Sequence, residues 1–220
     1  MKNFLLAIMS FLLIISIIFF FNDTNKNSVT SVPIIINYMT NNDCYNTNEK
    51  IKIKGIMVHS TSVPGVMAND WFKHWNKSYK FQETDREVCV HAFVDDKSIY
   101  QYLPWDHRGW HAGGPANNNY IGFEICEPPE ITYSNDHSTI VKYDFIKNQE
   151  YFDRIWNNSV YLCSFLCKKY NLTEKNIICH SEGASLGIAS NHPDITHWWP
   201  LHGKTMDMFR NDVKKQLNSL

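Results

Sequence analysis

The chain carries almost no excess charge of either sign. Its 220 residues include 21 Lys and Arg against 22 Asp and Glu, which gives a formal net charge of −1. No basic stripe runs along any segment, so the electrostatic attraction to phosphates that nucleic-acid binding requires is missing. Nucleic acid is therefore a poor candidate partner. Internal repeats are also absent, which argues against a repeat architecture.

The six cysteines lack the paired close spacing of a structural zinc site. Cys163 and Cys167 lie one helical turn apart, a common spacing in a helix core, and Cys89, Cys126 and Cys179 lie in apolar stretches typical of strands. We expect buried free thiols at these positions. An exported protein could also hold a disulfide, whose pairing the sequence does not reveal.

The N-terminal region contains a long apolar run that no small-residue cleavage site follows. This run covers residues 4–21 (FLLAIMSFLLIISIIFFF) and is just long enough to cross a bilayer as a helix. We favour an uncleaved membrane anchor over a removed signal peptide, and Lys2 favours an extracytoplasmic location for the rest. We divide the chain into this anchor or signal segment at 1–22, a linker at 23–44 rich in Asn, Thr and Ser, and one folded domain at 45–220.

Short apolar stretches and helical periodicities follow one another along the folded domain. Strands are predicted at 51–59, 88–94, 99–103, 120–126 and 176–179, with a further candidate at 32–38. Helices are predicted at 69–77, 148–170 and 204–217. This pattern favours an α/β single domain in which helices flank a central mixed β-sheet, preceded by the N-terminal hydrophobic helix.

Histidine is concentrated where a packed core would not place it. Residues 180–199 (HSEGASLGIASNHPDITHWW) hold several histidines and an aspartate in a loop broken by Gly and Ser. His59 and His180 each end a short apolar strand, where a sheet fixes a side chain and leaves it accessible. One strand-end His is more often structural than a ligand. Two of them, with the later His and Asp residues, indicate an open catalytic zinc site.

Four motifs occur in a specific order along the domain. They are VHST at 58–61, HAFVDDKSIYQYLP at 91–104, WHAGG with NNNYIGFEIC at 110–126, and HSEG with NHPDITHWWP at 180–200. On these motifs, the chain resembles the zinc-dependent N-acetylmuramoyl-L-alanine amidases, the family of bacteriophage T7 lysozyme and the peptidoglycan recognition proteins. Each motif is weak alone, but four in order are specific. The resemblance implies a peptidoglycan recognition protein-like fold and a Zn²⁺ cofactor.

The resemblance also implies three zinc ligands. The first two correspond to His59 and His180. The third is a Cys or an Asp in the following loop, and Asp194 is the candidate because that loop contains no Cys. His197 is the alternative, since neutral imidazole binds zinc well. Asp194 is favoured because the family places a catalytic Lys or His two residues before its third ligand, where His192 stands.

Further site residues follow from the same resemblance. Glu124 in GFE matches a GxE motif of the bacterial amidases, which favours a catalytic Glu124 beside a catalytic His192, although an outward-facing solvated Glu is the alternative. A carboxylate on an apolar strand is costly unless it meets a partner or water. A substrate groove is expected to be lined by His91, Trp110, His111 and Asn119. His91 could equally be a structural strand residue, and Asn119 part of a plain turn.

The hypothesis is hydrolysis of the amide bond between N-acetylmuramic acid and L-alanine in peptidoglycan. Two alternatives stay open, namely a non-catalytic peptidoglycan-binding module and a zinc hydrolase that acts on another amide. The presence of Asp194, His192 and Glu124 favours the enzyme over the binding module. Because peptidoglycan lies outside the cytoplasmic membrane, we expect a monomeric cell-envelope protein, either secreted or attached to the membrane through its N-terminal segment.

Overall fold

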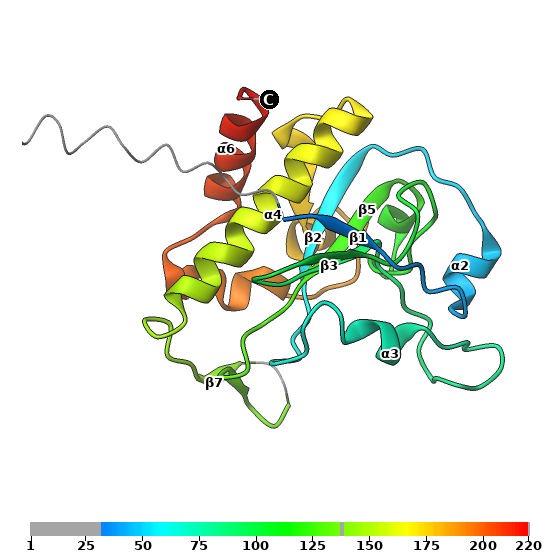
Figure 1. Ribbon diagram of the computed structural model, residues 1–220, viewed down its shortest axis with the longest axis horizontal. Helices are drawn as coiled ribbons and strands as arrows, with labels where there is room; N and C mark the ends of the chain where they lie inside the picture. The colour runs from blue at the N-terminus through cyan, green and yellow to red at the C-terminus, as the bar shows by residue number, and fades with distance from the viewer. Residues whose placement is uncertain (1–31, 137–138, 220) are drawn as a thin grey trace, which may run out of the picture. The chain divides into compact units, whose positions relative to one another are not determined.

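Six strands form the central sheet of the protein (Figure 1). The computed structural model describes residues 32–136 and 139–219. The strands follow the order β1-β4-β3-β5-β2-β8 across the sheet. Their bounds are Ile34–Ile36 (β1), Gly55–Ser60 (β2), Ala92–Val94 (β3), Ile99–Gln101 (β4), Tyr120–Ile125 (β5) and Ile177–Cys179 (β8). Neighbouring strands are parallel except for the β3–β4 hairpin, so the predicted mixed sheet is confirmed.

Helices pack on the sheet, and the two long ones lie side by side (Figure 1). The helices are α2 (Asp43–Thr47), α3 (Trp71–Trp75), α4 (Gln149–Tyr170), α5 (His180–Ser185) and α6 (Met206–Leu217). Single 3₁₀ turns are η1 (Pro115–Asn118), η2 (Glu174–Asn176), η3 (Asp194–His197) and η4 (Trp199–His202). A small ribbon of β6 (Thr132–Tyr133) and β7 (Ile140–Lys142) lies outside the main sheet. The predicted α/β class is therefore confirmed.

The alternation of side chains along β2 separates the core from the site. Every residue of β2 is buried, as expected for a parallel strand inside a sheet. Val58 joins Phe123 in the main core under α4 and α6. Because successive side chains of a strand point to opposite faces, Met57 and His59 face the other side. On that side, Trp71 of α3 packs on Phe93 of β3.

The folded domain begins earlier than the predicted boundary at residue 45. β1 pairs with β4 in parallel, and α2 begins at Asp43 with Asn42 as its N-cap. The prediction of a linker at 23–44 is therefore wrong for the residues that form β1 and the start of α2, whereas the candidate strand at 32–38 is confirmed. Three consecutive isoleucines in β1 gain enough from strand pairing to order a segment that is otherwise polar.

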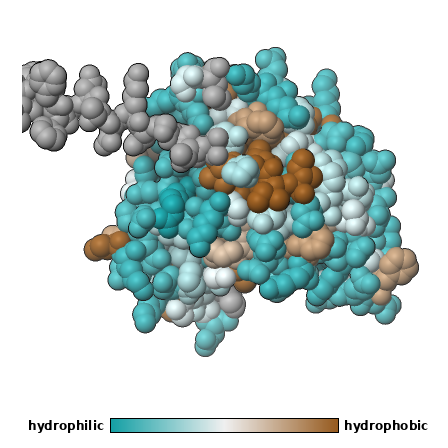
Figure 2. Space-filling model, in the orientation of Figure 1, coloured by the Kyte–Doolittle hydropathy of each residue, from teal (hydrophilic) through white to brown (hydrophobic). Residues whose placement is uncertain are grey.

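Strand β1 is an edge strand with an apolar surface. Figure 2 shows this surface as a hydrophobic patch where β1 lies in Figure 1, and Ile36 is 61% exposed. The strand is only three residues long, which limits edge-to-edge pairing with other chains.

Two further sequence predictions concern the termini and the thiols. The predicted hydrophobic segment at 4–21 lies outside the described residues. Within 32–136 and 139–219, none of the helices has the length and apolar character needed to cross a membrane. All six cysteines are buried and free, as predicted.

Candidate metal centre

Three neighbouring parallel strands end at the same edge of the sheet. β2 lies between β5 and β8, with His59 in register with Glu124 and Val58 in register with Cys179. His180 follows Cys179 directly as the first residue of α5. In open α/β sheets, functional groups gather at the carboxyl ends of the strands. The register therefore brings His59, Glu124 and His180 to one place, although they are far apart in the sequence.

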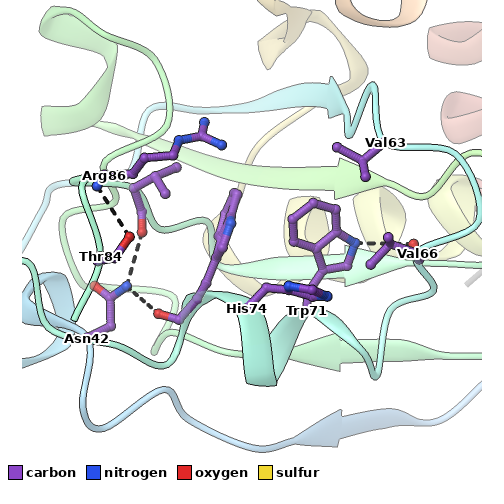
Figure 3. Close-up of a pocket in the computed structure, with 9 residues that line it drawn as sticks. Asn42, Val63, Val66, Trp71, His74, Thr84 and Arg86 are labelled. Atoms are coloured by element: carbon purple, nitrogen blue, oxygen red, sulfur yellow. Dashed lines mark hydrogen bonds between the residues drawn. The ribbon is translucent and has the colours of Figure 1, made fainter.

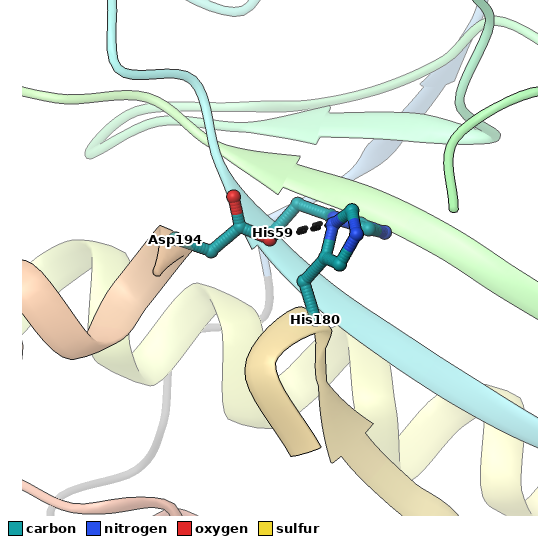
Figure 4. A group of neighbouring side chains, drawn as sticks. All are labelled: His59, His180 and Asp194. Carbon is teal, nitrogen blue, oxygen red and sulfur yellow. Dashed lines mark hydrogen bonds and ion pairs between the residues drawn. The ribbon is translucent and has the colours of Figure 1, made fainter. Parts of the chain in front are cut away.

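The donor atoms of His59, His180 and Asp194 converge (Figure 4). Oδ2 of Asp194 lies 3.0 Å from Nδ1 of His59 and 3.0 Å from Nδ1 of His180. The two Nδ1 atoms are 3.1 Å apart. All three residues are buried. The three ligands that the sequence suggested are thus placed together.

The backbone at Asp194 is held in an unusual conformation. Asp194 has a φ of 43°, in the left-handed region that Asp adopts more readily than most residues. It opens η3, and the next segment is tied to the end of β2 because Nε1 of Trp198 donates to Oγ of Ser60 at 3.0 Å. Ser60 in turn donates to Oε1 of the fully buried Glu127. This network fixes the Asp194 loop against the strand that carries His59.

Another histidine, His111, contacts the ring nitrogen of His59 that points away from Asp194. Nε2 of His59 lies 2.9 Å from Nδ1 of His111, and Nε2 of His111 lies 3.2 Å from the carbonyl oxygen of Tyr120. A carbonyl oxygen only accepts, so His111 donates to Tyr120 from Nε2 and accepts from His59 at Nδ1. Neutral His59 therefore carries its proton on Nε2. Its Nδ1 lone pair is left for a metal.

His180 is supported in the same way. Its Nε2 lies 3.1 Å from Oγ of Ser190, which donates to the carbonyl oxygen of Ala112 at 3.3 Å. The Ser190 hydroxyl therefore accepts from Nε2 of His180. This arrangement orients the Nδ1 lone pair of His180 toward Asp194 and His59.

The electrostatics of His59 and Asp194 favour the protonation states that metals require. Burial lowers the pKa of His59, although Asp194 acts against this change. Burial alone would raise the pKa of Asp194, but the adjacent side chains of His180 and His59 hold it below its ordinary value. Near pH 7, Asp194 is therefore an anion, and His59 is a neutral imidazole that can offer a lone pair to a metal.

The donor set fits a small divalent cation such as zinc. Two imidazole nitrogens and one carboxylate are a known ligand combination of catalytic zinc, which leaves a further position for water or substrate. The three donors lie within 4.8 Å of one another, and both imidazoles have hydrogen-bonded outer nitrogens.

Glu124 lies beside these donors, and one of its buried carboxylate oxygens, Oε2, lacks a hydrogen-bond partner among the described residues. It lines the same hollow as His59, His180 and Asp194. Burial raises the pKa of Glu124, and the nearby charges of Asp194 and Glu127 raise it further. A carboxyl group with a raised pKa at a concave site is suited to proton transfer.

His192 and His197 occupy different environments. The exposed His192 lines the hollow, and its ring centroid lies 5.1 Å from that of His180. His197 instead places Nε2 at 3.0 Å from Oε1 of Glu127 and 2.5 Å from the hydroxyl of Tyr133. The structure therefore brings Asp194, and not the alternative His197, to the candidate ligands His59 and His180.

Of the four residues predicted to line a substrate groove, only some lie at the hollow. His91 is fully buried, with Nε2 at 2.8 Å from the carbonyl oxygen of His107 and Nδ1 accepting from the amide of Gly122 at 3.1 Å. These contacts match the structural role that the sequence left open for His91, as the alternative to a substrate contact. Trp110 packs against a small core that includes Cys89, also away from the hollow.

Of the other two residues, His111 lies where it was predicted and Asn119 does not. His111 lines the hollow, but its two ring nitrogens are engaged by His59 and Tyr120. Asn119 does not line the hollow, and its carbonyl accepts from the amide of Lys54 at 2.8 Å. In this loop, Asn117 organises the backbone, because its Oδ1 accepts from the amides of His111 and Ala112.

Sequence reasoning missed two residues that shape the site. Ser190 gave no signal, because a Ser in a polar loop has many roles. Gly122 carried a signal, since it is the glycine of the GFE motif. A Cβ at Gly122 would lie 2.5 Å from the ring of His111, so only glycine lets His111 lie on the sheet and reach His59.

Similarity to known proteins agrees with this geometry. The sequence profile described as N-acetylmuramoyl-L-alanine amidase matches residues 49–196. The chain is 32% identical over 112 residues to the N-acetylmuramoyl-L-alanine amidase CwlH of Bacillus subtilis, a match over 49% of this chain and 36% of CwlH. It is 31% identical over 128 residues to the amidase XlyA of the same organism, over 57% of this chain and 35% of XlyA. The matches thus span about a third of these curated relatives.

A solved structure shares the fold. The Staphylococcus aureus hydrolase AmiA, solved in complex with its ligand, superposes with a TM-score of 0.66 over 87% of this chain and 86% of AmiA. At 19% identity, this likeness concerns the fold alone. With a family profile that covers most of the folded domain, the chain belongs to the N-acetylmuramoyl-L-alanine amidase family.

Proposed function

We propose that the protein is a zinc-dependent amidase that cleaves the bond between N-acetylmuramic acid and L-alanine in peptidoglycan. The observation that carries this proposal is the convergence of His59, His180 and Asp194 in a hollow that also contains Glu124. Membership of the amidase family and the amidase names of the curated relatives support the same reaction.

His59, His180 and Asp194 would hold the zinc ion. When bound there, zinc supplies Lewis acidity, which lowers the pKa of a water molecule and polarises a carbonyl group. His111 and Ser190 keep the two histidine rings oriented for this role. These contacts would hold the candidate ligands in place for the metal.

Glu124 would act as the general base and then as the general acid. It would take a proton from the attacking water and later pass it to the amine of the leaving alanine. His192 would donate a hydrogen bond to the oxygen that gains negative charge during the attack. Both roles are supported by the position of these side chains in the same hollow as the three ligands.

A non-catalytic peptidoglycan-binding module is the alternative function. Such a module needs neither a third ligand nor an acid near it. In this chain Asp194 is buried against both histidines, and Glu124 has an uncompensated carboxylate oxygen. A binding module gains nothing from these costly features, which favours the enzyme.

The proposed substrate decides where the protein acts. Peptidoglycan lies outside the cytoplasmic membrane, so we place the site of action in the cell envelope and propose that the protein works as a monomer. Anchoring or secretion through the N-terminal segment stays a proposal from the sequence.

Digestion of purified cell walls tests the proposed reaction. The full-length protein should release peptides with a new amino terminus at L-alanine, which N-terminal labelling and mass spectrometry detect. A chelator should abolish this release and zinc should restore it. Activity that persists with the chelator and in Asp194→Ala would contradict the zinc mechanism. Release of amino termini at another residue would contradict the assigned bond.

Zinc analysis of two variants separates the two candidate third ligands. Asp194→Ala should lose zinc and activity, whereas His197→Ala should keep zinc, since His197 contacts Glu127 and Tyr133 instead. Zinc content measured on purified variants is the readout. Loss of zinc in His197→Ala, with retention in Asp194→Ala, would make His197 the ligand.

A further inference from the structure

Two of the six buried thiols lie in a small apolar cluster outside the main core. Cys44 is in the first turn of α2, and Cys89 comes shortly before β3. Both residues are fully buried. They share the cluster with Leu103, and Tyr45 and Trp110 pack against it. Because the two cysteines are far apart in the sequence, only the tertiary structure brings them together.

The side chain of Asn42 joins the backbone segments that carry the two thiols. Its Oδ1 accepts from the amide of Cys44 at 2.9 Å, which caps α2. Its Nδ2 donates to the carbonyl oxygen of Trp75 at 2.8 Å and to that of Val88, the residue before Cys89, at 3.1 Å (Figure 3). One amide group therefore holds the first turn of α2 against the segment that leads into Cys89.

A short antiparallel contact positions the two cysteines from the other side. Cys89 and Trp110 exchange two backbone hydrogen bonds, of 3.2 and 2.9 Å. Sγ of Cys44 donates to the carbonyl oxygen of Arg108 at 2.9 Å, on the same segment as Trp110. The adjacent Cys44 thiol, together with burial, raises the pKa of Cys89 well above its ordinary value. The two sulfur atoms therefore adjoin, with residues 108–110 beside both.

We propose that Cys44 and Cys89 form a disulfide bond when the chain folds in contact with an exchangeable disulfide, such as glutathione disulfide or an oxidised dithiol protein. One cysteine thiolate attacks a sulfur of the external disulfide and displaces a thiolate. The other cysteine thiolate then attacks the protein sulfur of the mixed disulfide and displaces the second thiolate. The two displaced thiolates take up the two thiol protons, so the external disulfide is reduced to two thiols. No residue of the candidate metal centre takes part, and the inference does not depend on the proposed reaction.

Burial decides when this exchange takes place. In the folded chain neither cysteine has exposed area, and the raised pKa of Cys89 suppresses its thiolate. The external disulfide therefore reaches the two thiols only before α2 has packed on the rest of the domain. α2 has five residues and is too short to be stable by itself, so the thiols stay accessible during folding. Once α2 is in place, burial protects the bond from reductants.

Sequence separation distinguishes this pair from the other neighbouring cysteines. The loop from residue 44 to residue 89 includes β2 and α3, so a bond across it would remove much conformational freedom from the unfolded chain. Cys163 and Cys167 both lie in α4, where a bond would constrain a single helical turn. The Cys44–Cys89 bond would also secure β1 and α2, which precede the residues 49–196 that match the family profile.

Peptide mapping tests the pairing directly. The full-length protein is refolded in a buffer of reduced and oxidised glutathione, with refolding under excess reductant as the reference. Trypsin should then release peptide 27–50 linked to peptide 87–97, which mass spectrometry detects. Treatment with a reductant should separate the two peptides. Free thiols on both peptides, glutathione adducts in place of the link, or a link to another cysteine would each overturn the proposal.

Thermal unfolding measures what the bond contributes. The oxidised protein should melt roughly 10 °C above the reduced protein, because the cross-link restricts the unfolded chain. A chelator in both samples keeps them free of metal, so that the reductant acts on the thiols alone. Equal melting temperatures of the two wild-type forms would overturn the proposed stabilising bond.

Alanine variants show whether the difference comes from this pair. Cys44→Ala and Cys89→Ala should each melt at the same temperature with and without reductant. Cys126→Ala is the matched control, because Cys126 is equally buried but lies in the separate cluster that contains Trp71. This control should keep the difference between the oxidised and reduced forms. A difference that persists in Cys44→Ala or Cys89→Ala, or that disappears in Cys126→Ala, would overturn the assignment.

Discussion

The Nε2 atom of His59 lies 2.9 Å from the Nδ1 atom of His111. This contact makes His111, which lines the hollow as the sequence suggested, also a positioning residue for a candidate metal ligand. The second nitrogen of His111 is fixed by the carbonyl of Tyr120, so the hydrogen-bond directions of the pair are determined. Outer contacts of this kind commonly set the affinity of a metal site.

His111→Ala is expected to weaken zinc binding by roughly ten- to a hundredfold, because His59 loses the partner that orients its ring. Competition with a chromophoric chelator measures this affinity without any reliance on catalysis. Gly122→Ala should produce a similar loss, since its Cβ would meet the His111 ring at 2.5 Å. His74→Ala is the control, because its ring packs on Trp71. Unchanged zinc affinity in a folded His111→Ala protein would contradict the positioning role.

Ser190→Ala should weaken zinc binding by roughly tenfold, since the hydroxyl is the acceptor that orients His180. Ser190→Thr keeps a hydroxyl and is expected to restore most of the affinity. The same chelator competition measures both variants. If Thr and Ala at this position give equal losses, the effect comes from packing of the loop and the hydrogen bond has no role.

Glu124→Gln is expected to lower kcat for wall hydrolysis by about a hundredfold to ten-thousandfold, because the amide cannot transfer a proton. Its zinc content should equal that of the wild-type protein, since Glu124 is not among the three converging donors. Initial rates on solubilised peptidoglycan, with metal analysis of the same sample, separate the two effects. A variant that keeps full activity would exclude Glu124 as the general base.

Because His91 is buried, the free energy of unfolding is expected to fall at acid pH. Burial lowers the pKa of His91 from 6.5 to about 4, so the unfolded chain binds a proton in this window while the folded chain does not. The contribution of neutral His91 is therefore complete above pH 6.5 and is lost as the pH falls toward 4. The loss is on the order of 3 kcal/mol.

Urea unfolding of the zinc-free protein between pH 7 and pH 4 checks this expectation. His91→Gln cannot titrate, so its stability should depend less steeply on pH than that of the wild-type protein. Because this variant could unfold, NMR titration of the wild-type ring offers a second measurement. A ring that titrates near pH 6.5 in the folded protein would contradict the expected dependence.

Local patterns along the chain were sufficient to predict most of the strands and helices of the fold. The apolar runs of β2 and β5, and the helical period of α4, reflect burial on one or both faces of an element. Burial has a periodicity that each segment carries by itself. The sequence offered β1 as a candidate strand but assigned its residues to a linker, because the strand is stabilised by pairing with β4, which lies far away in the sequence.

The sequence by itself determined the family, the α/β class and the residue types of the site, because apolar periodicity and ordered motifs are local properties. Only the tertiary structure decided which polar residues meet. It turned His111 toward His59 and Ser190 toward His180, placed His197 on Glu127, and buried His91 inside the sheet. These choices depend on strand register and on contacts between distant segments, which no local pattern specifies.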